Sequence, residues 1–112
     1  MSDARLPAHL EVAALIRAAE ACGGFGTVLN KGERDSGVIL ILTIERGLNP
    51  RLWERMPRLD GRRVFEVVRE QSSENSKEFQ EYLARRTSRD RDIWLIELDI
   101  PNAERLIAEF AC

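Results

Sequence analysis

The sequence predicts an α+β fold, a single domain in which about five mostly antiparallel strands form a sheet flanked by three helices. Two observations predict this class. The segment 23–47 combines a Gly-Gly helix stop, a short strand, a polar loop and a nearly continuous apolar strand. The length of 112 residues, with 44% hydrophobic and 32% charged residues, suits one core and no second one. We therefore expect residues 1–112 to form one domain with the element order α-β-β-β-β-α-β-α.

The first helix is predicted over Ala8 to Cys22, because Pro7 suits a first helical turn and Gly23-Gly24 supplies a stop. Apolar side chains cover most of its circumference, so we expect this helix to be covered on more than one side. Its outer apolar residues are small. We name Ala14, Ala18 and Ala21 the alanine strip, which would let a second helix or a second subunit approach closely.

Two strands are predicted next, over Phe25 to Asn30 and Val38 to Glu45. The polar loop from Lys31 to Ser36 is expected to close them into a hairpin. The run from Val38 to Leu42 is apolar on both alternating faces, which is typical of a central strand covered on both sides.

A third and a fourth strand are predicted over Arg51 to Met56 and Arg63 to Arg69, toward one edge of the sheet. Asp60-Gly61 favours a two-residue hairpin turn between them. If this turn sets the register, the facing pairs are Arg51–Glu70, Leu52–Arg69, Trp53–Val68, Arg55–Glu66 and Met56–Phe65. Two of the Arg residues are then neutralised by Glu66 and Glu70 of the neighbouring strand.

The last three elements are predicted to be a surface helix, a strand and a short helix. The surface helix runs to about Arg86, with a narrow apolar stripe of Phe79, Tyr82 and Leu83. The strand from Ile93 to Asp99 is apolar on much of both faces, which favours a second central strand. Pro101 opens the last helix, whose inward residues are expected to be Ala103, Leu106, Ile107 and Phe110.

Charge is almost balanced over the chain but unevenly distributed. The net charge of -2 argues against a protein whose main task is to coat nucleic acid. Residues 46–69 hold seven Arg against three acidic residues, and residues 92–112 hold five acidic residues against one Arg. We expect one basic and one acidic region on the surface.

The sequence favours a cytoplasmic protein that has no contact with a membrane. Cys22 and Cys112 form neither a disulfide framework nor a zinc-ligand spacing. The start of the chain lacks the pattern of a secretory signal. The longest apolar run, Val38 to Leu42, is far below the roughly 18 residues that a membrane span needs.

Several short motifs together resemble a family of short alphaproteobacterial proteins, the family catalogued as domain of unknown function fourteen ninety-one. The motifs extend over nearly the whole chain: Arg5-Leu6-Pro7, Gly23-Gly24-Phe25, Lys31-Gly32 with Asp35 and Gly37, Glu54-Arg55-Met56, Phe79 with Tyr82-Leu83, and Asp92 with Trp94. The resemblance implies a bacterial source. It implies no known activity and assigns no functional residues.

The chain shows no catalytic, metal-binding or cofactor-binding motif, so no catalytic residue, metal or cofactor is expected. His9, the sole histidine, has no Ser, Cys or carboxylate at a spacing that predicts an activated pair. The glycines of the segment 23–26 follow a helix and precede a strand, which is the reverse of a phosphate-binding loop.

Arg51, Trp53 and Arg55 are the strongest candidates for ligand binding, because strand alternation places all three on one face. The Arg side chains could hold phosphates, and Trp53 could stack on a base or another flat ligand. The alternative is a covered, salt-bridged sheet face, for which the register above supplies Glu66 and Glu70.

We expect a non-enzymatic protein that works by association with itself or with another protein, through the alanine strip or the Trp53 face. The reason is that one small domain rarely covers the first helix and both faces of two apolar strands without help. The alternative is nucleic-acid or nucleotide binding at Arg51, Trp53 and Arg55. An enzyme that uses scattered carboxylates also stays open.

Overall fold

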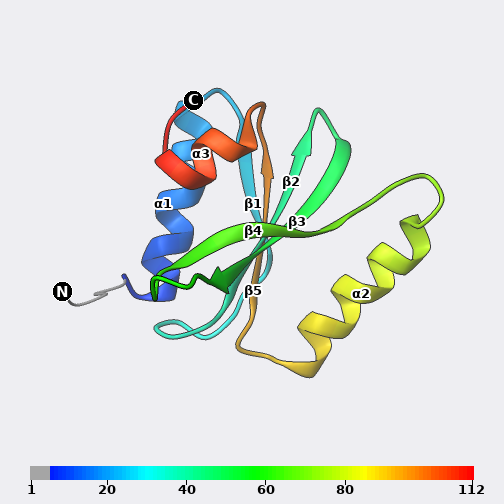
Figure 1. The fold of residues 1–112 in the computed structure, drawn as a ribbon, viewed down its shortest axis with the longest axis horizontal. Helices are drawn as coiled ribbons and strands as arrows, with labels where there is room; N and C mark the ends of the chain where they lie inside the picture. Colours follow the sequence, from blue (N-terminus) through cyan, green and yellow to red (C-terminus); the bar gives the residue numbers. More distant parts are fainter. Residues whose placement is uncertain (1–5) are drawn as a thin grey trace.

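The helices and strands follow one another in the predicted order, in a computed structural model that describes residues 6–112 (Figure 1). The elements are α1 (Ala8–Ala21), β1 (Phe25–Asn30), β2 (Ile39–Glu45), β3 (Leu48–Pro57), β4 (Arg63–Glu70), α2 (Ser76–Arg89), β5 (Trp94–Asp99) and α3 (Ala103–Glu109). Arg5, one of the residues that carry the family resemblance, lies outside the described residues. Within residues 6–112, no helix is both long and apolar enough to span a membrane.

The sheet is the middle layer of the molecule. α1 and α3 cover one face of it and α2 covers part of the other (Figure 1). Each face has its own core: Ile39 and Ile41 belong to the cluster with α1 and α3, whereas Leu40 and Leu42 belong to the cluster with α2. Strand alternation therefore explains why β2 is apolar at every one of these positions.

The strand order is β1-β5-β2-β3-β4, which confirms β2 and β5 as the centre of the sheet. The predicted hairpin between β1 and β2 is wrong, because β5 lies between these strands. β5 pairs antiparallel with β1 and parallel with β2, which makes the sheet mixed but mostly antiparallel. A strand that is apolar on both faces is best placed between two neighbours, because a central position buries both of its faces and both of its edges.

The loop between β1 and β2 crosses the start of β5. A Cβ atom at Gly32 or at Gly37 would overlap the carbonyl oxygen of Asp92, so only glycine permits this close approach. The indole of Trp94 donates a hydrogen bond to the carbonyl of Glu33, at 2.6 Å. These contacts hold the loop across the start of β5, so that β5 can lie between β1 and β2.

β2 and β3 form a tight hairpin, although the predicted strands left residues 46–50 between them. Arg46 and Gly47 both have positive φ, 53° and 77°, as a two-residue type I′ turn requires. β3 consequently begins at Leu48, before the predicted Arg51. Asn49, with φ of 54°, and Pro50 lie in an irregular part of the ladder, where the register between β2 and β3 shifts.

The register of β3 with β4 agrees with the prediction at one end only. The pairs Arg51–Glu70 and Leu52–Arg69 are confirmed, and a shift in β4 then moves every later pair by one residue. The predicted pairs Trp53–Val68, Arg55–Glu66 and Met56–Phe65 are wrong; the observed pairs are Trp53–Val67, Arg55–Phe65 and Met56–Val64. The extra residue, Val68, forms a β-bulge.

The turn between β3 and β4 is the cause of the different register. The two-residue turn predicted for Asp60-Gly61 is wrong: the loop has three residues, closed by a hydrogen bond from the amide of Arg58 to the carbonyl of Arg62 at 2.7 Å. Gly61 has φ of 89°, the conformation that ends this type of loop.

The C-terminal part of the chain returns to the end of α1. Cys22 and Cys112 form a disulfide across a sequence separation of 90, with their Cα atoms 5.4 Å apart. The expectation that these cysteines form no disulfide framework is therefore wrong, because folding joins positions whose spacing carries no local signal.

Phe110 was expected to point inward but is 57% exposed, since it ends α3 with φ of 53°.

Candidate functional site

Trp53 lies on the face of β3 that α1 and α3 cover. Its side chain is only 6% exposed and belongs to the cluster with these helices. The indole N–H donates a hydrogen bond of 2.8 Å to the hydroxyl of Thr43 on the neighbouring strand β2. The flat face of Trp53 is therefore part of the core in this conformation.

The two Arg residues beside Trp53 connect β3 to the covering helices. Arg51 forms an ion pair of 2.5 Å with Glu104 of α3, and its guanidinium carbon lies 5.3 Å from the ring centre of Trp53. Arg55 forms an ion pair with Glu11 of α1. The hydrogen bond from Arg51 lowers the pKa of the Glu104 carboxyl.

The face of Arg51, Trp53 and Arg55 is thus covered and salt-bridged, but not by the acidic residues that the predicted register supplied. Both carboxylate partners come from helices. Nucleic-acid or nucleotide binding at these three residues stays a prediction, and it would have to use the partly exposed guanidinium groups without the indole face.

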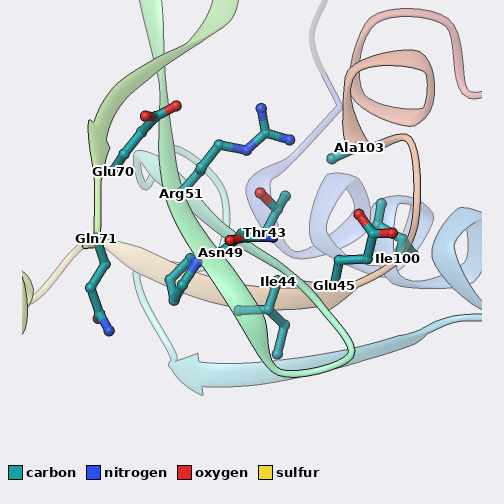
Figure 2. A pocket seen from close by; sticks show the side chains of 10 residues that line it. Thr43, Ile44, Glu45, Asn49, Arg51, Glu70, Gln71, Ile100 and Ala103 are labelled. Atoms are coloured by element: carbon teal, nitrogen blue, oxygen red, sulfur yellow. The ribbon is translucent and has the colours of Figure 1, made fainter. Parts of the chain in front are cut away.

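A pocket of about 320 Å³ opens beside Arg51, where the ladder between β2 and β3 is irregular (Figure 2). Its lining is mostly polar: Thr43, Ile44, Glu45, Asn49, Pro50, Arg51, Glu70, Gln71, Ile100 and Ala103. In Figure 2 the side chain of Arg51 extends toward Ala103, on the α3 side of the pocket.

The chemistry of this pocket gives it no clear ligand. One guanidinium, already paired with Glu104, lies among the carboxylates of Glu45 and Glu70, so the pocket does not attract phosphate. In the part of the chain that the structure describes, no three His, Cys, Asp or Glu residues are grouped to hold a metal ion.

The alanine strip is used partly within the chain. Ala18 packs against the core cluster that α1 shares with α3 and the sheet, and α3 contacts α1. Ala14 is half-buried and Ala21 is exposed. The strip therefore leaves a smaller free surface than a bare helix would offer.

A different surface, which was not predicted from the sequence, is the outer edge of β1, which we name the β1 edge (Phe25–Asn30). β5 occupies the inner side of β1, and no strand within residues 6–112 pairs with the outer side. Three large apolar side chains are exposed along it: Phe25 at 72%, Val28 at 42% and Leu29 at 48%. The strand carries no charged residue. The sequence shows this, but it did not indicate an exposed edge as long as β1 was predicted to pair with β2.

Comparison with known proteins agrees with the fold and with the resemblance seen in the sequence. The chain matches the model of a family described as protein of unknown function (DUF1491) over residues 6–108. No protein with a curated annotation matches it.

Three solved structures have the same fold, each with a TM-score of 0.74. The crystal structure of a DUF1491 family protein from Caulobacter crescentus CB15 is 33% identical and covers 85% of this chain and 88% of its own. An NMR structure of a DUF1491 family protein from the same organism is 31% identical, with 93% and 94% covered. Protein Atu0922 from A. tumefaciens is 27% identical, with 93% of each chain covered. Since the family model covers nearly the whole chain, the protein belongs to the DUF1491 family of proteins of unknown function.

Proposed function

We propose that this protein acts without catalysis, by association with another polypeptide strand that adds to the β1 edge. The observation that carries the proposal is the combination of an unpaired strand side, three exposed apolar side chains and no charge on β1. Exposed edges of this kind pair readily with a further strand, and main-chain hydrogen bonds supply much of the affinity.

The backbone of β1 offers hydrogen-bonding groups to such a strand. The amide of Trp94 donates to the carbonyl of Val38, just before β2, at 2.8 Å, and the amide of Ile100 donates to the carbonyl of Ile44 in β2, at 3.0 Å. The even-numbered residues of β5 therefore direct their backbone groups toward β2. The odd-numbered residues Glu97 and Asp99 direct theirs toward β1, where they face Thr27 and Phe25. By the alternation of an antiparallel ladder, the N–H and C=O groups of Gly26 and Val28 point away from the sheet.

The opposite edge of the sheet shows how this fold protects a strand that stays unpaired. β4 carries four charged residues, Arg63, Glu66, Arg69 and Glu70, and a bulge at Val68. Charges and bulges on an edge strand discourage pairing with another chain. β1 has a register shift only near its end, between Val28 and Asn30, and no charge. The contrast between the two edges favours β1 as the associating one.

The test is affinity purification from the native bacterium with the wild-type protein and with Val28→Pro. Proline removes the outward amide of Val28, which β5 does not use, so the fold should persist while strand addition is lost. Leu59→Lys, at the fully exposed tip of the β3–β4 hairpin, is the control for a changed surface.

We expect a polypeptide that wild type and Leu59→Lys retain and Val28→Pro loses, with all three proteins unfolding at similar temperatures. The same set of polypeptides on wild type and on Val28→Pro would overturn the proposal. Co-purified nucleic acid on both, without a polypeptide, would favour the alternative at Arg51 and Arg55. The cytoplasmic location stays a prediction, and a Cys22–Cys112 disulfide found after rapid thiol trapping in cells would contradict it.

A further inference from the structure

We infer that the strand which covers the β1 edge is β1 of a second copy of this chain, paired antiparallel about a two-fold axis that passes beside Thr27. The inference rests on the proposed function and names its partner. The two sheets would then join into one continuous sheet with ten strands, twice the five of a single chain.

The outward backbone groups select one register for this pairing. Gly26 and Val28 are the residues of β1 that direct both N–H and C=O away from β5. In an antiparallel pair, residues that exchange two hydrogen bonds lie directly opposite each other. When Gly26 of one chain faces Val28 of the partner, the two-fold axis creates the same pair again, so all outward groups of both residues are used in four hydrogen bonds. This register places Thr27 opposite Thr27 of the partner subunit.

Side chains on the helix-covered face of β1 fit this register. A Cβ atom at Gly26 would lie 2.8 Å from Ile16 of α1, so residue 26 has no room for a side chain on that face. Opposite Gly26, the partner's Val28 meets no competing side chain. Val28 is 42% exposed in a single chain, and pairing would bury it.

Side chains on the other face of β1 are also complementary. Phe25 is 72% exposed on this face, and the register brings it to the end of the partner's β1, where Leu29, the extra residue at the register shift, is 48% exposed. Because the axis generates this contact twice, an exposed Phe25 lies near an exposed Leu29 at each end of the interface. Aromatic and aliphatic pairs across neighbouring strands stabilise a sheet.

The absence of charge on β1 is compatible with a second copy as partner. β1 itself is uncharged, so two copies approach without repulsion along the strand. The charged residues that lie beside β1 are Glu97, opposite Thr27, and Asp99, opposite Phe25, both on β5 and one strand away from the edge.

The position of Thr27 on the axis allows a test by charge exchange. Thr27→Lys places two like charges opposite each other in the pair, and so does Thr27→Glu, whereas a mixture of both variants restores opposite charges. Leu59→Lys adds the same charge far from the β1 edge and is the matched control. The molar mass of each protein is measured by light scattering after size-exclusion chromatography, over a range of concentrations.

We expect wild type and Leu59→Lys to dimerise, and the mixture of the two Thr27 variants to recover a dimer. Thr27→Glu alone should dimerise at least about tenfold more weakly, and Thr27→Lys should be less affected because Glu97 of its own chain lies opposite residue 27. In the wild type, the amides of Gly26 and Val28 should exchange with solvent more slowly as the dimer fraction rises.

A monomeric wild type at every concentration would overturn the second copy as partner. The proposed function would still stand in that case if a different polypeptide depended on Val28 in the purification above. A wild-type dimer that Thr27→Glu leaves intact, or a mixture of the two Thr27 variants that stays monomeric, would overturn the β1 pairing about Thr27.

Discussion

Replacing Thr43 with Val tests whether Trp53 is a core residue, as the structure shows, or an available stacking surface. Thr43 is 2% exposed and its hydroxyl accepts the hydrogen bond from the Trp53 indole. Valine keeps the shape of threonine but cannot accept this bond. A buried indole N–H would then have no partner.

The expected cost follows from the burial of both groups. An unsatisfied buried donor destabilises a protein by about 1–3 kcal/mol. With an unfolding entropy of roughly 2.1 cal/mol/K per residue, a chain of 112 residues loses about 4 °C in Tm for each kcal/mol. We therefore expect Thr43→Val to lower Tm by about 4–12 °C. Thr43→Ser keeps the hydroxyl and removes one methyl group, so it should cost only about 0.5–1.5 kcal/mol.

The assay is a double-mutant cycle with Trp53→Phe, measured by urea unfolding. Phenylalanine has no N–H, so Thr43→Val should cost at least about 1 kcal/mol less in the Trp53→Phe background than in the wild type. Equal costs of Thr43→Val in the two backgrounds would refute the hydrogen bond. A Trp53 that soluble quenchers reach easily in the folded protein would refute its burial under α1 and α3.

Three further predictions concern contacts that hold separate elements together. Cys112→Ser removes the disulfide and should destabilise the oxidised protein by up to about 4.6 kcal/mol, the loop-closure value for a separation of 90. The stability of the reduced protein should not change. Equal stability of the wild type and the variant under oxidising conditions would argue against the bond. Glu54→Gln weakens the paired hydrogen bonds from Arg86 of α2, at 2.7 and 3.2 Å, and should lower the free energy of unfolding in urea by about 1 kcal/mol. An unchanged free energy of unfolding would mean that α2 is held by its apolar side chains alone. Because Arg51 lowers the pKa of Glu104 in the folded state, this carboxylate stabilises the protein above its unfolded pKa, and the stabilisation is lost as the pH falls through the folded pKa. Wild type should therefore lose slightly more stability than Glu104→Gln between about pH 5 and pH 3, by less than about 1 kcal/mol because Glu104 is largely exposed; a larger loss in the variant would contradict the sign.

The element types and the centre of the sheet could be predicted from the sequence, because they depend on patterns within about ten residues. The run from Val38 to Leu42 and the segment from Ile93 to Asp99 are apolar on both faces, and both became central strands. The three helices were also predictable, since glycine, proline and apolar spacing mark their positions.

The neighbours of each strand could not be predicted in the same way. The β1–β2 connection has the length and composition of a hairpin loop, yet β5, from more than 60 residues further along, takes the place beside β1. The glycines that permit the crossing, Gly32 and Gly37, are also ordinary turn residues. Nothing local distinguishes a loop that closes a hairpin from a loop that passes over another strand.

The partners of the Arg residues were unpredictable for a second reason. The three-residue turn moves the register of β3 with β4 by one residue, and the extra residue Val68 restores the predicted register only at Leu52 and Arg51. Arg55 thus faces Phe65 on β4 and finds its carboxylate on α1, at Glu11. The sequence could predict that the face of Arg51, Trp53 and Arg55 is salt-bridged. It could not predict which carboxylates pair with the two Arg residues, because these depend on how the helices pack on the sheet.

The candidate interface was hidden by the same error in topology. An uncharged strand such as β1 suits the centre of a sheet, where both sides are paired, and the hairpin prediction gave it a neighbour in β2. Once β5 is known to fill the inner side, the absence of charge becomes unusual, because β4 at the other edge has four charges in eight residues. Selection for solubility alone would favour charges on both edges. An edge kept free of charge, with Phe25 and Leu29 exposed on it, is instead what a strand-pairing surface requires.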